Sequence, residues 1–187
     1  MIIWDWIQTL LKLTQRFLLR QLITDDISDK YLSWLNREES PYIDYGKNHS
    51  TMEELKVYVS ERERKKDVLF LAIFTKKKKH IGNIKYEPID LIRKTATMGI
   101  LIGDKDWRGK GVAIEVIKAS AHYLNSIYGV TTIFLGVNPN HQVAISVYKK
   151  IGFKFKGHDK NNTKMIWQLW FNSTIESIKN IVIDFKL

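Results

Sequence analysis

Residues 95–137 restrict the fold more than any other part of the chain, because they describe three consecutive elements in a fixed order. Thr95–Ile102 has the length and apolar content of a strand. After a charged loop, Val112–Tyr128 places apolar side chains on one helical face, and Gly129 is typical of a helix end. Val130–Val137 is rich in β-branched residues and predicts the next strand. This strand–helix–strand unit predicts a sheet with helices on its faces.

The rest of the chain adds more strands than helices. The run Lys76–Lys79 separates two apolar segments and predicts the turn of a β-hairpin. Thr51, with a glutamate three residues later, forms a capping box that opens a helix. Further strands are expected at residues 16–23, 68–74, 80–86, 153–157 and 164–170, and further helices at 27–35, after Thr51, at 143–150 and after Ser173. This order predicts an α/β fold in which helices flank a mixed, mostly antiparallel sheet.

The length of 187 residues and the apolar fraction of 44% are those of one domain with its own core. We therefore expect a single domain over residues 1–187, with an amphipathic N-terminal extension at 1–15 and a C-terminal extension at 172–187.

The N-terminal extension repeats its apolar residues at helical spacing, which leaves two interpretations. The first is a helix packed on its own domain or on a second subunit, which would allow a homodimer. The second is a helix on a membrane surface, with Arg16 and Arg20 near the lipid headgroups. The first is favoured, because the apolar run is too short to cross a bilayer and no basic region precedes it. Membrane association is therefore not expected.

Composition excludes several kinds of chemistry. The chain has no cysteine, which excludes disulfides, cysteine–metal sites and a thiol nucleophile and is compatible with the cytoplasm. Its five histidines lack metal-ligand spacing, so no metal is expected. The net charge of +10 permits an anionic ligand, but the lysine run lacks the interleaved aromatic residues of a nucleic-acid surface. Nucleic acid is therefore not an expected partner.

The loop before the central helix carries the strongest signal for a ligand. Gly109 and Gly111 allow backbone N–H groups to turn toward one point, and the helix that follows adds further unpaired N–H groups. Arg108 and Lys110 add positive charge. The spacing matches neither the nucleotide-triphosphatase loop nor the dinucleotide loop, whose last small residue is replaced here by Ile114. The segment predicts a pyrophosphate site of another kind.

Two motifs resemble those of the GNAT superfamily of N-acetyltransferases. The first is Arg108-x-x-Gly111-x-Ala113, and the second is the segment from Ala144 through Tyr148 to Gly152-Phe153. The segments 17–20 and 31–36 are also similar to the opening of the branch that contains the ribosomal-protein N-terminal acetyltransferases. The resemblance covers about residues 16–170.

The resemblance implies an acetyl-CoA-dependent transfer of an acetyl group to a primary amine, without a covalent enzyme intermediate. It assigns Tyr148 to the thioester sulfur as the catalytic residue. The residues expected to bind the cofactor are Ile100, Leu101, Ile102, Arg108, Gly109, Lys110, Gly111, Val112, Ala113 and His141. An alternative is a non-catalytic acyl-CoA-binding module of the same fold.

The sequence departs from the family pattern at the proton acceptor. Thr97 stands where many relatives carry a carboxylate, so a water chain, Glu87, Asp44 or His141 would have to serve as the base. Without a strong base, an amine of low pKa is favoured over a polyamine, and the positive net charge favours the same choice. A nucleotide-linked amino sugar or a protein N-terminus is therefore expected, with Trp34, Tyr42, Tyr45 and Glu87 as candidate acceptor-binding residues.

Overall fold

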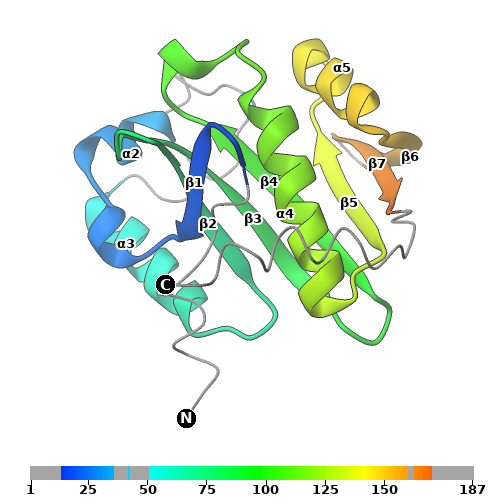
Figure 1. Cartoon of the computed structure of the whole chain (residues 1–187), viewed down its shortest axis with the longest axis horizontal. Coiled ribbons are helices and arrows are strands. Elements are labelled where there is room, and N and C mark those ends of the chain that lie inside the picture. Colours follow the sequence, from blue (N-terminus) through cyan, green and yellow to red (C-terminus); the bar gives the residue numbers. More distant parts are fainter. Residues whose placement is uncertain (1–13, 36–41, 43–50, 160–161, 170–187) are drawn as a thin grey trace.

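The computed structural model describes residues 14–35, 42, 51–159 and 162–169, and the sheet and helices follow the expected order (Figure 1). The strands are β1 (Phe17–Gln21), β2 (Leu69–Thr75), β3 (His80–Asp90), β4 (Thr95–Ile102), β5 (Thr132–Val137), β6 (Lys154–Asp159) and β7 (Asn162–Gln168). The α-helices are α2 (Asp29–Trp34), α3 (Met52–Glu63), α4 (Val112–Tyr128) and α5 (Gln142–Ile151), with 3₁₀ turns η1 (Thr24–Asp26) and η3 (Lys105–Trp107). The predicted N-terminal and C-terminal helices lie outside the described residues.

Within this part of the chain the strands form one seven-stranded sheet in the order β1-β2-β3-β4-β5-β7-β6. The neighbouring pairs are antiparallel except β4 and β5, which are parallel. The parallel pairing covers only Thr95–Thr97 of β4 and Thr132–Phe134 of β5, although both strands continue beyond it. The expectation of a mixed, mostly antiparallel sheet is confirmed, and the sheet divides where these two strands stop pairing.

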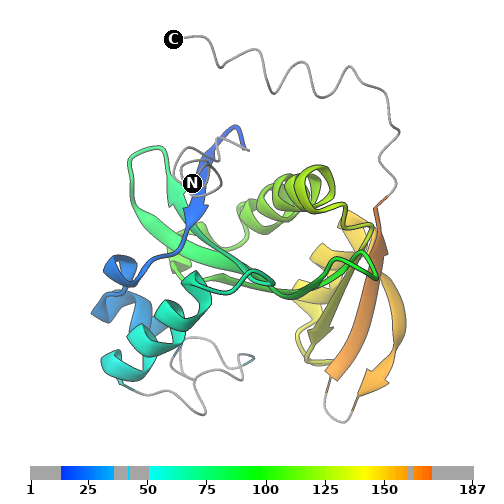
Figure 2. The same ribbon diagram turned by 90° about the horizontal axis from the view of Figure 1, so that it is seen from below.

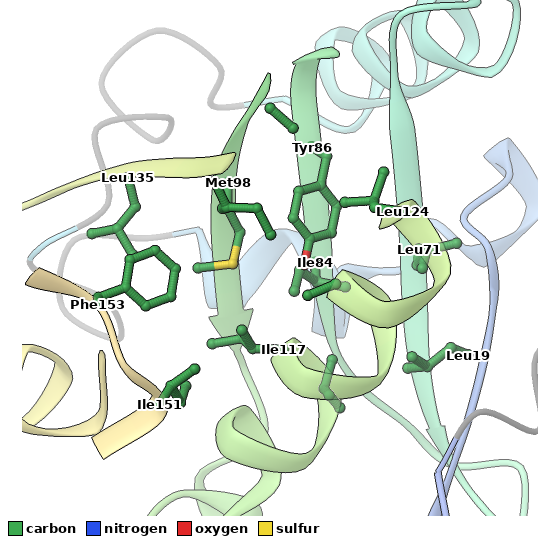
Figure 3. Packing of buried hydrophobic residues seen from close by; sticks show 14 of the residues in the cluster. Leu19, Leu71, Ile84, Tyr86, Met98, Ile117, Leu124, Leu135, Ile151 and Phe153 are labelled. Carbon is green, nitrogen blue, oxygen red and sulfur yellow. The ribbon is translucent and has the colours of Figure 1, made fainter. Parts of the chain in front are cut away.

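Helices cover both faces of the sheet. Helix α4 lies on one face, and α2 and α3 lie on the other face over the half that contains β1 to β4 (Figure 2). Helix α4 is held by Val116, Ile117 and Leu124, which are fully buried against the sheet. Figure 3 shows this packing, in which the α4 residues meet side chains of β2, β3 and β4 on one side and Phe153 lies near Leu135.

A second, smaller core fills the space under α2 and α3. It joins Tyr31, Trp34, Leu55 and Val59 of the helices with Leu101 and other residues of the sheet. The capping box at Thr51 is present, since its side chain accepts from the backbone N–H of Glu54. No helix in the described ranges is long and apolar enough to cross a membrane.

Candidate active site

The loop between β4 and α4 has the geometry of an anion site. Gly109 and Gly111 have φ angles of +72° and +76°, a left-handed conformation that favours glycine. A side-chain carbon at Gly109 would meet nothing within 4 Å, and at Gly111 it would meet only the Arg16 guanidinium, at 3.6 Å. Among the described residues, the N–H groups of Gly111, Val112 and Ala113 find no acceptor. Together with the positive end of α4, these donors fit a pyrophosphate.

Arg108 holds this loop against the end of β4. Its Nε donates to the carbonyl oxygen of Ile102 at 2.9 Å, and one terminal nitrogen donates to the carbonyl oxygen of Gly103 at 3.1 Å. The side chain therefore fixes where the loop leaves the strand, and its charge stays beside the helix N-terminus. Lys110 places its ammonium 5.8 Å from the ring centre of Trp107, so it adds positive charge to the same loop.

The edge of β4 presents backbone groups where β5 has separated. Gly103 donates its N–H to Ile81 of β3, which makes Leu101, two residues earlier, a hydrogen-bonded partner of Asn83. Ile100 and Ile102 then direct their backbone groups away from β3, toward the side that β5 has left. The carbonyl of Ile102 is taken by Arg108. Among the described residues, Ile100 therefore has both its N–H and its carbonyl available for the pantetheine arm, and Ile102 has its N–H.

Tyr148 lies on α5 and packs against Phe153, with 5.7 Å between the ring centroids. Burial raises the pKa of its hydroxyl to about 12. The hydroxyl has no hydrogen-bond partner in the described parts of the chain. It is therefore a protonated donor that is free to bond to a ligand. Figure 1 shows the N-terminal ends of α4 and α5 at the same edge of the sheet, where β4 and β5 end.

His141 and Tyr42 lie together at the N-terminal end of α5. Their rings are stacked with centroids 4.2 Å apart. Burial lowers the pKa of His141, and the positive charge of Arg108 lowers it further. His141 is therefore a neutral ring at pH 7, and the stacking places the Tyr42 ring at the N-terminal end of α5. Tyr45 and Asp44 lie outside the described residues.

The candidate base Glu87 is already engaged by basic side chains. Its carboxylate lies 2.9 Å from Arg62, 2.7 Å from Lys85 and 3.8 Å from Lys65. Burial would raise the pKa of Glu87, but the bonds to Lys85 and Arg62 outweigh burial and lower it. An ionised carboxylate held in this way is a weak proton acceptor. Thr97 is exposed on β4 and carries no ionisable group.

Trp34 is placed in the core rather than on a surface. It is 4% exposed, and its indole lies so close to Gly103 that a side-chain carbon there would come within 2.0 Å of the ring. The ring also packs edge-on against His80, at 5.1 Å. The geometry therefore gives Trp34 a packing function at the start of the coenzyme loop, and nothing in it supports stacking on an acceptor.

Asp104 anchors the same loop, although no sequence motif singles it out. This buried carboxylate lies 2.8 Å from Lys30 and 2.9 Å from Lys79, the last residue of the lysine turn. Burial would raise its pKa, but the two ammonium groups hold the pKa at about 2. Lys76–Lys79 forms the turn between β2 and β3, as expected, and Lys79 is the lysine of this turn with an ion-pair partner among the described residues. No group of three potential metal ligands occurs in the described residues.

A mixed sheet whose two parallel strands separate beside a helix N-terminus, with N–H groups left without an acceptor in the described parts of the chain, is an arrangement that suits a phosphate-bearing ligand. A family model described as the acetyltransferase (GNAT) domain matches residues 16–154, and the chain belongs to this family. The family and the fold implied by the two sequence motifs are thus confirmed.

Sequence relatives match a smaller part of the chain. A spermine/spermidine N(1)-acetyltransferase of Bacillus subtilis is 33% identical over 64 residues, which are 34% of this chain and 42% of that protein. An N-alpha-acetyltransferase of Saccharolobus solfataricus is 33% identical over 73 residues, 39% of this chain and 42% of that protein. The chain therefore aligns with about two-fifths of the length of these relatives.

The fold is shared more completely with solved structures. The spermidine N-acetyltransferase of Vibrio cholerae, in complex with CoA and spermine, superposes with a TM-score of 0.71 at 21% identity, covering 81% of this chain and 95% of that one. A dodecameric structure of the same Vibrio cholerae enzyme superposes with a TM-score of 0.67 at 20% identity, covering 81% and 93%. At these identities the similarity shows the fold.

Proposed function

We propose that this chain is an acetyl-CoA-dependent N-acetyltransferase that transfers an acetyl group to a primary amine. The observation that carries the proposal is the set of unpaired N–H groups at the start of α4, beside the free edge of β4. Family membership supports the same activity. The names of the relatives, which acetylate polyamines or α-amines, support it as well.

The coenzyme supplies an acetyl thioester, and the chain's own groups orient it. The N–H groups of Gly111, Val112 and Ala113 would bond the pyrophosphate, and the free backbone groups of Ile100 would bond the amides of the pantetheine arm. The Tyr148 hydroxyl would donate a hydrogen bond to the sulfur as the carbon–sulfur bond breaks. Because the pKa of Tyr148 is raised to about 12, its hydroxyl stays protonated and acts as a donor.

The acceptor amine would lose its proton largely to water. Glu87 is held by Lys85 and Arg62, and Thr97 cannot accept a proton from an ammonium group. His141 is neutral and is the remaining described candidate for a base. The rate should therefore depend on the neutral fraction of the free amine, which is large for an α-amine with a pKa of about 8 and small for a polyamine.

The charges near Thr97 bear on which amine is accepted. Three basic side chains, Arg62, Lys65 and Lys85, contact the carboxylate of Glu87, and Arg62 also lies 3.8 Å from the carboxylate of Glu61, so the basic groups outnumber the acidic ones by one. This surplus of positive charge favours an acceptor that also carries an anionic group, such as a nucleotide-linked amino sugar or a peptide α-amine. Polyamines are the second candidate, because the Bacillus subtilis relative is named for them.

The test is acetyl-CoA-dependent release of free thiol with a matched panel of acceptors at pH 7.5 and pH 9. The panel contains spermidine, a peptide with a free α-amine and a nucleotide-linked amino sugar. The proposal predicts turnover with at least one primary amine and the highest kcat/KM for an acceptor that has an anionic group. Binding of acetyl-CoA without turnover on any amine would instead support a non-catalytic acyl-CoA-binding module, and spermidine as the best substrate would refute the charge argument.

A further inference from the structure

Arg16, which precedes β1, contacts two parts of the coenzyme loop and helix. Its Nε donates to a carboxylate oxygen of Glu115 at 2.6 Å, and its backbone N–H donates to the other oxygen at 2.9 Å. One terminal nitrogen, Nη1, donates to the carbonyl oxygen of Lys110 at 3.1 Å. The side chain is thus fixed by residues about a hundred positions away in sequence, all of them at the N-terminal end of α4.

The second terminal nitrogen of Arg16 is left without a partner. Within the described ranges Nη2 donates no hydrogen bond. It is also the atom nearest to Gly111, at 3.6 Å from the position of a side-chain carbon there. The side chain of Arg16 is 47% exposed, so a ligand can reach it. A fixed guanidinium with one terminal nitrogen unbonded among the described residues therefore lies at the cap of the helix that presents the anion site.

The partner of Arg16 is the carboxylate of Glu115, whose negative charge lies beside the proposed anion site. Glu115 lies in the first turn of α4, and its negative charge would repel a phosphate at the helix N-terminus. The ion pair with Arg16 compensates that charge. It also orients the guanidinium, because the bond from Nε to Glu115 and the bond from Nη1 to Lys110 together fix the plane of the fork.

We propose that Arg16 binds a phosphate group of the coenzyme through Nη2 and that Glu115 positions it. This inference rests on the proposed function, since it adds a side-chain ligand to the same coenzyme site. The pyrophosphate and the 3′-phosphate of CoA offer the same chemistry to a guanidinium, and comparing CoA with dephospho-CoA distinguishes them.

The test compares acetyl-CoA with acetyl-pantetheine, a donor that lacks these phosphates. In Arg16→Ala the kcat/KM for acetyl-CoA should fall at least about tenfold, mainly through KM, because a charge-assisted hydrogen bond is lost. The kcat/KM for acetyl-pantetheine should not change. Arg93→Ala is the matched control: it removes the same charge from an exposed ion pair with Asp90, in the turn after β3, and should leave both values unchanged.

Equal losses with both donors would overturn the proposal, because they would mean that Arg16 only stabilises the loop. Unchanged CoA affinity in Arg16→Ala, measured by calorimetry, would overturn it as well. Arg16→Lys retains a charge without the fork and should give an intermediate loss. Arg16→Ala/Glu115→Gln should recover part of the affinity, because the unpaired carboxylate is gone. A wild-type protein that binds no CoA would instead refute the proposed function itself.

Discussion

The two ends of α4 offer a matched pair of substitutions that tests the coenzyme loop. Gly111 and Gly129 cap the helix with similar left-handed conformations, at φ +76° and +66°. Valine at either position should strain the backbone to a similar extent, but only Gly111→Val places a side chain at the proposed anion site. We expect both variants to lose stability and only Gly111→Val to lose affinity for acetyl-CoA.

The magnitudes follow from the backbone and from the space around each glycine. A left-handed conformation costs an L-residue about 1–2 kcal/mol, and a chain of this size loses about 2–4 °C in Tm for each kcal/mol. At Gly111 the first side-chain carbon makes an ordinary contact with the Arg16 guanidinium, so a valine there stands beside the groups proposed to bind phosphate. Loss of one charge-assisted hydrogen bond costs about 1.5–3 kcal/mol, or about 10- to 100-fold in affinity.

The assay is thermal unfolding of both variants, followed by calorimetric titration with acetyl-CoA at a temperature where both are folded. Similar Tm values with a lower affinity only in Gly111→Val would support the loop as the phosphate site. If Gly111→Val is folded and binds acetyl-CoA as tightly as Gly129→Val does, that reasoning is refuted, because no ligand atom would then approach Gly111.

Four further predictions concern the leaving thiolate, the proton, the acceptor and the loop anchor. Tyr148→Phe should lower kcat about 100-fold with little change in acetyl-CoA affinity; equal turnover would leave Tyr148 with a packing function alone. In wild type, kcat/KM for the acceptor should rise with pH and level off near the amine pKa, with no decline from Tyr148 below its own pKa of about 12. Thr97→Glu should raise kcat/KM for spermidine at pH 7 relative to kcat/KM for an α-amine, and the same panel of acceptors measures both values. Asp104→Asn should cost about 1–2 kcal/mol of unfolding free energy at pH 7. Because the pKa of Asp104 is depressed to about 2, the wild-type advantage should be complete above its unfolded pKa and should disappear as pH falls toward 2.

The elements that the sequence predicted best are those whose signals are local. Strand 95–102 and helix 112–128 were predicted with the bounds observed, because the apolar run, the helical spacing and the glycine after the helix all lie in or next to these elements. Strand β3 runs to Asp90, beyond the predicted end at Tyr86. A register shift between Tyr86 and Ile89 lets the strand continue past the proline between them, and a single sequence carries no clear signal for such a bulge.

The site was only partly predictable, because its details depend on residues far apart in sequence. The glycine loop and the position of Tyr148 follow from short motifs, and the structure gives both a geometry that fits those predictions. The sequence could not show that Leu101 pairs with Asn83 and leaves Ile100 at the free edge, since that depends on strand register. Nor could it show that Glu87 is held by Arg62 from α3, 25 residues earlier.

The two faces of the sheet carry different charges: α4 with Arg16 lies on one face, and Glu87 contacts Arg62 of α3 on the other. On the coenzyme side, the only acidic side chain in the first turn of α4 is compensated by Arg16, so the helix end remains positive for a phosphate. On the other side, basic side chains compensate Glu87, so the carboxylate cannot attract an ammonium group strongly. A cationic amine would therefore gain little electrostatic attraction from either face, whereas the binding of a neutral amine does not depend on such attraction. Because both carboxylates are compensated, we expect the best acceptors to have an amine of low pKa and to carry an anionic group elsewhere in the molecule.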